Sequence, residues 1–351
     1  MNIAIAPPDE AARAAAHARW AACAHPLGGL GLLETALEDI AALTGSTEIA
    51  LSPRAVLVLC ADNGVVAQGV TQTDSSVTAA AARGLAGHRT AVCRMAAVAH
   101  CDVVPVDMGI RDFAGAPGIL NRRIANGTAD ITLGPAMTRA QAEQAVQTGI
   151  ELVAMQKASG MRLLATGEMG IGNTTTSSAV ASVLLGRAPS ETTGRGAGLS
   201  DAGLARKIAA IETAIRRNHP DPSDPLDVLA KVGGLDIAGL CGVFLGGAIH
   251  RIPVLADGFI STVAALCAVR LCPQATQAIF ASHVSAEPAS HMVLDALGKK
   301  PLITAELHLG EGTGAVAAMP LLDMAHAVYT ESYTFDECGV PAYQPLGGAG
   351  C

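Results

Sequence analysis

The sequence is poor in aromatic and charged residues, which make up 3% and 15% of its 351 residues, while half of the residues are apolar. Disordered chains and long coiled coils carry far more charge, so neither class fits. Long basic runs are also missing: the net charge is −8, and Arg122-Arg123 and Lys299-Lys300 are isolated pairs. A nucleic-acid-binding surface is therefore not expected.

Recognisable metal-ligand spacings are missing as well, because the nine cysteines form no Cys-x-x-Cys pair and the ten histidines no His-Glu-x-x-His motif. The cysteines are scattered through apolar segments, which is typical of reduced thiols in the cytoplasm. The longest apolar stretch, residues 237–249, is shorter than the about 20 residues of a membrane span. The N-terminal stretch has no signal-peptide pattern. We expect a soluble, cytoplasmic protein without a metal.

From about residue 54 onward, short β-branched runs alternate with longer alanine-rich segments of helical periodicity. This alternation is typical of repeated βα units, which form a parallel sheet covered by helices. The sequence predicts an α/β, Rossmann-like fold with a six-stranded parallel sheet flanked by helices. The expected strands are 55–60, 102–107, 161–166, 252–257, 277–281 and 302–308.

The N-terminal residues follow a different pattern, with expected helices at 9–22 and 31–44 separated by a glycine-rich turn. We expect residues 1–50, with part of 321–351, to form a smaller helical domain. Residues 51–320 would then form the large α/β catalytic domain.

Each expected strand is followed directly by a polar or glycine-rich turn. Because parallel strands end at the same edge of a sheet, these turns should line one crevice, where α/β proteins bind ligands. The turns are 62–64, 107–109, 167–175, 257–258, 282–288 and 310–314.

Two of these turns carry a carboxylate between glycines: Glu168 in Gly167-Glu168-Met169-Gly170, and Glu311 in Gly310-Glu311-Gly312. Each follows an expected strand and opens an expected helix, so both should lie beside unpaired amide groups of a helix N-terminus. Glu311 is the candidate general base, because its flanking glycines permit close approach of a flat ligand. A stabilising carboxylate in a first helical turn explains either residue singly about as well.

The 167–175 turn suits an anion such as a phosphate, because its glycines leave amide groups free at the start of a helix. It is neither a Walker A loop nor a Gly-x-Gly-x-x-Gly fingerprint, and an ordinary capped helix start is the alternative. Lys207 and Ser285 could add a charge and a hydroxyl to such a site. A solvated helix lysine and a merely structural His283 are the ordinary alternatives.

Several segments resemble, in order, the nicotinate-nucleotide:dimethylbenzimidazole phosphoribosyltransferase family, which prepares the lower-ligand nucleotide of cobamides. The resemblance runs from about residue 25 to about residue 340, nearly the whole chain. The matching segments are Ala61-Asp62-Asn63-Gly64-Val65-Val66, Gly134-Pro135-Ala136-Met137-Thr138, the 167–175 turn, Gly194-Arg195-Gly196-Ala197-Gly198-Leu199, Gly233-Gly234-Leu235-Asp236-Ile237-Ala238, Asp257-Gly258-Phe259-Ile260-Ser261, Ser282-His283-Val284-Ser285-Ala286-Glu287-Pro288 and Leu309-Gly310-Glu311-Gly312-Thr313-Gly314-Ala315.

The resemblance implies transfer of phosphoribose from nicotinate mononucleotide to an aromatic nitrogen base, which releases nicotinate and gives an α-ribazole 5′-phosphate. It implies a homodimer that needs no metal or organic cofactor. Glu311 matches the family's base, and Glu168 is the second catalytic candidate. The positions implied around the nucleotide are Gly170, Gly172, Asn173, Thr174, Lys207, Gly258, Ser285, Gly310 and Gly312.

The chain departs from the family pattern at two places. Many relatives have Lys-Pro-x-Gly-Ser-Leu where this chain has residues 25–30, and residues 71–76 replace a segment that often carries an aromatic residue near the incoming base. The acceptor therefore stays open among dimethylbenzimidazole, another benzimidazole, a purine and a phenol. A catalytically silent nucleotide-binding homologue is the alternative function, and an oxidoreductase lacks the dinucleotide fingerprint.

Overall fold

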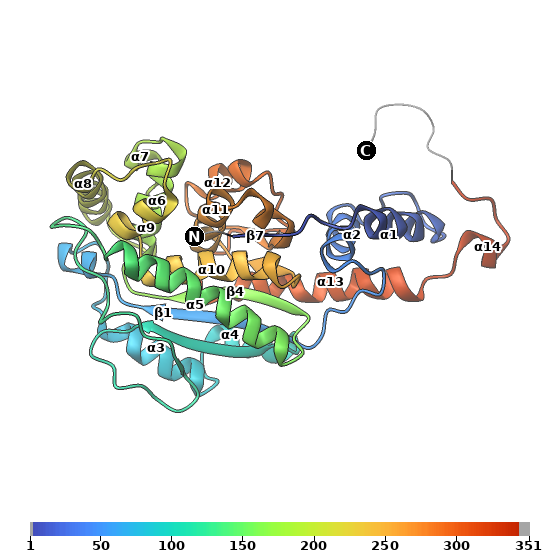
Figure 1. Ribbon diagram of the computed structural model, residues 1–351, viewed down its shortest axis with the longest axis horizontal. Helices are drawn as coiled ribbons and strands as arrows, with labels where there is room; N and C mark the ends of the chain where they lie inside the picture. Colours follow the sequence, from blue (N-terminus) through green and yellow to red (C-terminus); the bar gives the residue numbers. More distant parts are fainter. Residues whose placement is uncertain (1–2, 344–351) are drawn as a thin grey trace.

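The computed structural model describes residues 3–343 and has a six-stranded parallel sheet at its centre (Figure 1). The strand order is β3-β2-β1-β4-β5-β6, which reverses direction between β1 and β4. Ligands of open α/β sheets bind outside the carboxyl ends of strands near such a reversal. The strands are β1 Arg54–Ala61, β2 Asp102–Gly109, β3 Leu120–Asn121, β4 Leu163–Met169, β5 Val254–Ala256 and β6 Ile279–Ala281. The predicted fold class is confirmed.

Helices cover both faces of this sheet. The α-helices are α1 Glu10–Ala22, α2 Leu32–Thr44, α3 Ser76–Ala86, α4 Ala91–Val98, α5 Arg139–Ala158, α6 Asn173–Leu185, α7 Pro189–Thr192, α8 Asp201–Asn218, α9 Pro225–Val232, α10 Leu235–Ile249, α11 Phe259–Leu271, α12 Ser290–Leu297, α13 Thr313–Glu331 and α14 Phe335–Cys338. Two 3-10 helices, η1 Gly64–Gln68 and η2 Pro273–Ala278, and a separate two-stranded sheet of β7 His283–Val284 and β8 Ile303–Thr304 complete the fold.

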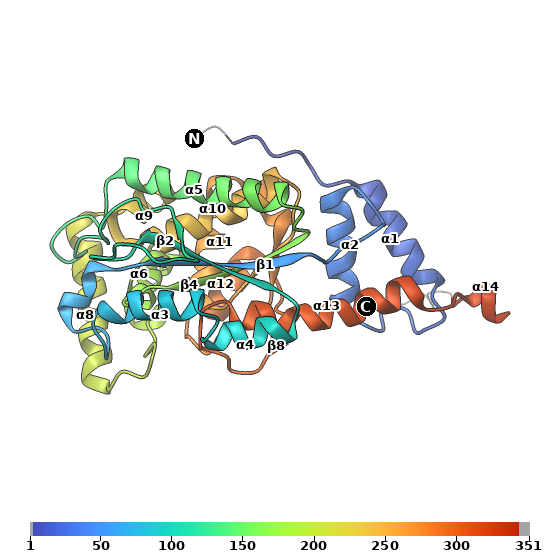
Figure 2. The same ribbon diagram turned by 90° about the horizontal axis from the view of Figure 1, so that it is seen from below.

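Strand β1 separates two hydrophobic cores because its side chains alternate between the sheet faces. Leu57 and Leu59 join the core beneath α5 and α10, whereas Val56 and Val58 join the core that includes residues of α3, α4 and α13. Figure 2 shows these helices on opposite sides of the sheet. All residues of β1 are buried, as expected for a central strand of a doubly covered parallel sheet.

Helices α1 and α2 lie at the far end of α13, beyond the sheet (Figures 1 and 2). The Trp20 and Tyr329 rings pack with centroids 5.1 Å apart, and Arg19 Nε donates to the Tyr329 carbonyl at 2.6 Å. Cys23 pairs with Thr334 in an isolated antiparallel bridge. The predicted helices at 9–22 and 31–44 are confirmed as α1 and α2. The boundaries of the two domains stay a prediction, and residues 344–351 lie outside the described part.

The expected strand at 302–308 is wrong. Residues 303–304 pair with β7 in the separate sheet, and the sixth strand of the large sheet is β3. Glu306 has a positive φ of 52°, and the His308 ring is within hydrogen-bonding distance of its carbonyl (2.8 Å), so an extended ladder cannot continue. Strand β3 has two residues, too few for a recognisable alternation of apolar and polar side chains.

Within residues 3–343, no helix is long and apolar enough to cross a membrane. The cysteines that the structure describes in this range are free thiols. Six of these cysteines are buried, Cys101 is half-buried and Cys338 is exposed. Cys351 lies outside the described residues.

An ion pair between a buried arginine and a partly exposed aspartate, whose side chain is 43% exposed, ties β1 to α13. Arg54, the first residue of β1, is 3% exposed and makes two 2.7 Å hydrogen bonds to the Asp323 carboxylate. Its Nε also donates to the Ala99 carbonyl at 2.9 Å, just after α4. One guanidinium therefore joins the sheet to two helices on the same face.

We predict that Asp323→Ala lowers the free energy of unfolding by about 2–3 kcal/mol, because it leaves the buried Arg54 guanidinium without its counter-charge. Urea titration followed by circular dichroism measures the loss. The matched control is Glu331→Ala, which removes an exposed carboxylate from the same helix and should change stability by less than about 0.5 kcal/mol. Equal losses in the two variants would contradict a specific role for the pair.

Candidate active site

A cavity of about 220 Å³ lies at the carboxyl edge of the sheet, beyond the ends of β4 and β5. Five segments that are far apart in the sequence line it. They are the end of β4 with the start of α6, the loop before α8, the start of α11, the residues after β6, and the loop before α13. These segments contribute residues 168–174, 196–197, 257–261, 283–287 and 308–311.

Most of the residues predicted from the sequence meet at this cavity. Those lining it are Glu168, Gly170, Asn173, Thr174, Gly258, Ser285, Gly310 and Glu311. Gly172, Lys207 and Gly312 do not line it, although Lys207 Nζ contacts the lining residue Thr174. The turns at 62–64 and 107–109, also expected in the crevice, do not line the cavity. Their carboxylates accept hydrogen bonds from other segments instead, Asp62 from Thr78 and Arg111 N, and Asp107 from Gly109 N and Ile110 N.

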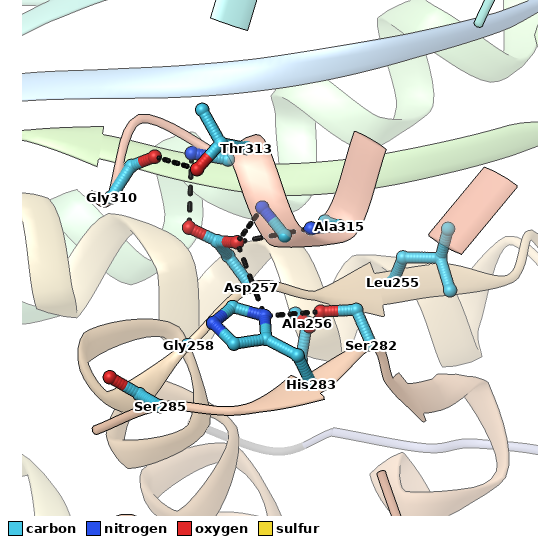
Figure 3. Close-up of polar contacts among 12 residues, drawn as sticks. Leu255, Ala256, Asp257, Gly258, Ser282, His283, Ser285, Gly310, Thr313 and Ala315 are labelled. Atoms are coloured by element: carbon cyan, nitrogen blue, oxygen red, sulfur yellow. Dashed lines mark hydrogen bonds and ion pairs between the residues drawn. The ribbon is translucent and has the colours of Figure 1, made fainter. Parts of the chain in front are cut away.

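The Asp257 carboxylate fixes the Glu311 loop to the sheet edge (Figure 3). Its Oδ2 accepts a hydrogen bond from Gly312 N at 3.0 Å, and its Oδ1 accepts from the N–H groups of Gly314 (2.9 Å) and Ala315 (3.0 Å). Helix α13 has no capping bond from its own N-cap residue, Gly312. Asp257, from the end of β5, therefore caps α13 and satisfies its first amide groups.

Glu311 has a left-handed backbone conformation with φ of 59°, between Gly310 at 83° and Gly312 at 90°. A non-glycine residue in this region costs about 1 kcal/mol or more, and such strain concentrates at functional sites. A Cβ at Gly167 of β4 would lie 2.5 Å from the Glu311 carbonyl oxygen, so that glycine permits the loop to lie on the strand. Glu311 Oε2 is buried without a hydrogen-bond partner among the described residues. This oxygen is free to accept a proton from a ligand.

Glu168 lies inside the end of β4 rather than after it, because β4 extends to Met169, beyond the predicted end at 166. Asn173, the first residue of α6, donates its side-chain N–H to Glu168 Oε2. Burial raises the pKa of Glu168 to about 8, and the nearby Asp236 and Asp257 carboxylates add to this effect. The raised pKa favours the protonated form of Glu168, which shares the cavity with Glu311.

The N-termini of α6 and α11 both reach the cavity, and neither receives a capping bond from the side chain of its N-cap residue, Gly172 or Gly258. In α6, Asn173 N and Thr175 N donate to the carbonyls of Gly170 and Gly172 at 2.9 Å each, so the contribution of α6 to an anion site is mainly its positive dipole end. Ser261, in the first turn of α11, adds a buried hydroxyl without a partner among the described residues.

Lys207 of α8 is fully buried, so the interpretation as a solvated helix lysine is wrong. Its Nζ donates to Thr174 Oγ1 at 2.9 Å and to the Gly194 carbonyl at 3.0 Å. Burial lowers the pKa of Lys207 to about 8, while Glu287 opposes this shift. The lysine places a positive charge directly behind the start of α6.

His283 lines the cavity beside Gly258. Its Nδ1 lies 3.1 Å from Ser282 Oγ and 3.7 Å from Asp257 Oδ1 (Figure 3). Because Ser282 Oγ donates its proton to the Ala256 carbonyl, we assign the proton of the neutral ring to Nδ1. Burial lowers the pKa of His283, and Asp257 opposes the shift. The contacts of Nδ1 fit the structural interpretation of His283. They do not account for Nε2, which carries no proton and can accept a hydrogen bond.

Sequence reasoning missed three acidic residues around this cavity. Asp257 was expected only as part of an Asp-Gly turn, and Glu287, which accepts from Gly196 N at 3.0 Å, only as part of a matching segment. Asp236, at the start of α10, accepts a 3.1 Å hydrogen bond from Asn173 and is fully buried. A carboxylate in a strongly apolar segment, such as 235–249, was the available signal. Residues 3–343 contain no cluster of three or more side chains suited to a metal.

Comparisons with known proteins agree with one another. Residues 5–340 match a family described as phosphoribosyltransferase. Two curated relatives are called nicotinate-nucleotide–dimethylbenzimidazole phosphoribosyltransferase. The one from Ruminiclostridium cellulolyticum is 47% identical over 92% of this chain and 91% of its own, and the one from Geobacter metallireducens is 43% identical over 96% of each.

A solved structure extends this similarity to the fold. The crystal structure of CobT from Thermus thermophilus is 40% identical, with a TM-score of 0.90 over 95% of this chain and 100% of that one. The chain therefore belongs to the phosphoribosyltransferase family whose curated members are nicotinate-nucleotide–dimethylbenzimidazole phosphoribosyltransferases.

Proposed function

We propose that this protein transfers phosphoribose from nicotinate mononucleotide to an aromatic base such as dimethylbenzimidazole, giving α-ribazole 5′-phosphate and nicotinate for cobamide assembly. The observation that carries the proposal is the shared cavity of Glu168, Glu311 and two helix N-termini. The relatives that match over nearly the whole chain bear the same activity in their names. Nothing in the described residues favours the catalytically silent alternative.

In this proposal the phosphate lies at the start of α6 and α11. Gly170, Asn173, Thr174 and Gly258 line this end of the cavity, and Ser285, beside Gly258, adds a hydroxyl. Lys207 and Gly172 support this end from behind, since Lys207 holds the Thr174 hydroxyl. Charge on Lys207 and two helix dipoles then favour the phosphate together.

The acceptor base lies at the Glu311 end of the cavity, where Gly310 lines the wall without a side chain beside Glu168. One ring nitrogen attacks the anomeric carbon as the bond to nicotinate breaks, and that bond's electron pair stays on the nicotinate nitrogen. Glu311 takes the proton from the other ring nitrogen, so charge does not build up on the product. Positioning and stabilisation of an oxocarbenium-like transition state supply the remaining rate.

Residues 71–76, where the chain departs from the resemblance, approach the cavity lining through Gln72. Gln72 Nε2 donates to the carbonyl of Ala197 at 3.0 Å, and Ala197 lines the cavity. A polar segment thus lies beside the pocket in place of the family's aromatic one.

We also propose that the protein acts as a homodimer in the cytoplasm. The helical lobe, which comprises α1, α2 and the chain from the end of α13 onward, supports this because it exposes large apolar side chains: Leu27, Leu32 and Tyr333 are 39%, 38% and 63% exposed. Light scattering coupled to size-exclusion chromatography distinguishes a dimer from a monomer.

The proposed activity predicts nicotinate release that depends on both substrates. The protein is incubated with nicotinate mononucleotide and, separately, dimethylbenzimidazole, benzimidazole, adenine or a phenol, and products are separated by liquid chromatography. We expect release of nicotinate with at least one base and formation of the matching ribotide. No release with any base at high enzyme concentration would refute the proposal.

For Glu311→Gln we predict that kcat falls by roughly 10²- to 10⁴-fold, because the amide cannot accept the ring proton. Circular dichroism should show an intact fold. The matched control is Glu306→Gln, which changes an exposed carboxylate in the same loop region and should keep near-normal turnover. Full activity in Glu311→Gln would remove this residue from the role of base.

The lowered pKa of Lys207 leads us to predict that the affinity for the nucleotide depends on pH. The charged amine attracts phosphate, so KM for nicotinate mononucleotide should rise as the pH increases through about 8, the pKa of Lys207. Lys207→Met should raise KM about tenfold at neutral pH and remove this dependence. Arg206→Met, which removes an exposed neighbouring charge, should leave KM nearly the same. An equal KM in Lys207→Met and the wild type would exclude the lysine from binding.

A further inference from the structure

The wall behind Glu168 contains a second buried carboxylate that faces no cation. Asp236 is fully buried, and Asn173 Nδ2 donates to both carboxylates, to Glu168 Oε2 and to Asp236 Oδ2. Asp236 does not line the cavity, whereas Glu168 and Asn173 do. One amide therefore connects a carboxylate at the cavity to another carboxylate deeper in the protein.

We propose that Asp236 is a positioning residue that keeps Glu168 protonated, so that Glu168 donates a hydrogen bond to the substrate while Glu311 accepts a proton. This inference rests on the proposed phosphoribosyl transfer for its kinetic consequences. Glu168 and Glu311 thus have opposite roles, donor and acceptor, and Asp236 causes the difference between them.

The charges that face Glu168 are all negative or neutral. Asp236 comes from α10, Asp257 from the end of β5 and Glu311 from the loop before α13, while the buried Cys60 of β1 is a neutral thiol. Asp62, after β1, faces Asp236 in turn. In residues 3–343, no lysine, arginine or histidine forms an ion pair with Glu168 or Asp236. Two adjacent buried carboxylates without a cation cannot both ionise cheaply, so one keeps its proton.

The hydrogen bonds indicate which carboxylate is protonated. Asp236 Oδ1 accepts from Ile237 N at 3.0 Å and Oδ2 from Asn173, so both of its oxygens meet donors. It also lies in the first turn of α10, where the helix dipole favours a negative charge. Its pKa rises to about 6, mainly through burial, and stays below the value of about 8 for Glu168. The proton therefore belongs to Glu168 at neutral pH.

The hydrogen bonds also indicate which oxygen carries the proton. Glu168 Oε2 accepts from Asn173, which leaves Oε1 for the O–H group. Oε1 lies 2.8 Å from the position of a Cβ at Gly310, so it faces the Glu311 loop and the cavity. A side chain at residue 310 would block this oxygen.

This arrangement predicts an alkaline limb in the pH profile of kcat. A carboxyl with a raised pKa is protonated below that value and loses its proton as the pH rises through about 8. Asp236→Asn removes a neighbouring negative charge, which lowers the pKa of Glu168, so the limb should move to lower pH by about one unit. Glu168→Gln, which cannot ionise, should lose the limb. The rate is measured at saturating nucleotide, because Lys207 loses its charge in the same range and acts on KM.

The matched control is Asp107→Asn. Asp107 is a buried carboxylate at the end of β2 that bonds Gly109 N (2.9 Å), Ile110 N (2.8 Å) and Arg123 (3.4 Å), and it does not contact Glu168 or Asn173. Its variant should keep the limb at the wild-type pH. A merely structural Asp236 would instead lower kcat by the same factor at every pH, and that result would overturn the proposal.

An infrared measurement tests the same inference without turnover. The difference spectrum between wild type and Glu168→Gln at neutral pH should contain the carbonyl band of a protonated carboxyl. As the pH is raised, Asp236→Asn should lose this band at a lower pH than the wild type does. An ionised Glu168 at neutral pH would overturn the inference. Absence of turnover in the wild type would refute only the proposed function. If Asp236→Asn does not fold, Asp236→Ser supplies the same comparison.

Discussion

The contact between the Asp257 carboxylate and the start of α13 is the interaction on which the candidate site depends. Three amide groups, from Gly312, Gly314 and Ala315, converge on one side chain at the end of β5. Because these amides would otherwise be unpaired at a buried helix start, their satisfaction fixes where α13 begins. The loop just before that point contains Glu311 in a strained conformation. The sheet edge thus determines the position of the candidate base, and β5, which contributes no base itself, supplies the restraint.

The same edge gathers carboxylates without matching cations, and this has a chemical consequence. Glu168, Asp236 and Asp257 are buried, and each is held by hydrogen bonds rather than by an ion pair with lysine or arginine. Amide donors stabilise the ionised forms of Asp236 and Asp257, whereas Glu168 has one amide partner and a higher pKa than Asp236. Environments that push neighbouring pKa values apart separate acids from bases at one site. Lys207 bonds Thr174 and the Gly194 carbonyl instead and forms no ion pair with these carboxylates among residues 3–343.

The sequence predicted those features that local patterns encode, and it missed those that depend on contacts between residues far apart in the chain. The alternation of strands and helices is local, and it predicted the parallel sheet and five of its strands near their observed positions. The glycine-framed carboxylates were also visible locally, so Glu168 and Glu311 were found. Asp257 and Asp236 act through contacts with residues 55 and 63 positions away in the chain, and no local pattern encodes such a contact. Lys207 looked like a solvated helix residue because its burial comes from Thr174 and the 194–196 loop, which only the folded chain brings to it.

Helix α13 makes the helical lobe part of the same mechanical unit as the site. Its first turn is held by Asp257, its middle by the ion pair between Arg54 and Asp323, and its last turns by Arg19 and Trp20 of α1. Pro320, between the first two contacts, removes one backbone hydrogen bond from the helix, so bending there is easier than elsewhere along it. The bond to Asp257 lies on the site side of Pro320 and the contacts with α1 lie on the other side. The Arg54–Asp323 ion pair, however, lies between Pro320 and α1 and ties α13 to the sheet. A shift of the helical lobe would therefore reach the Glu311 loop only through two anchored points, Asp323 and the amide groups bound to Asp257.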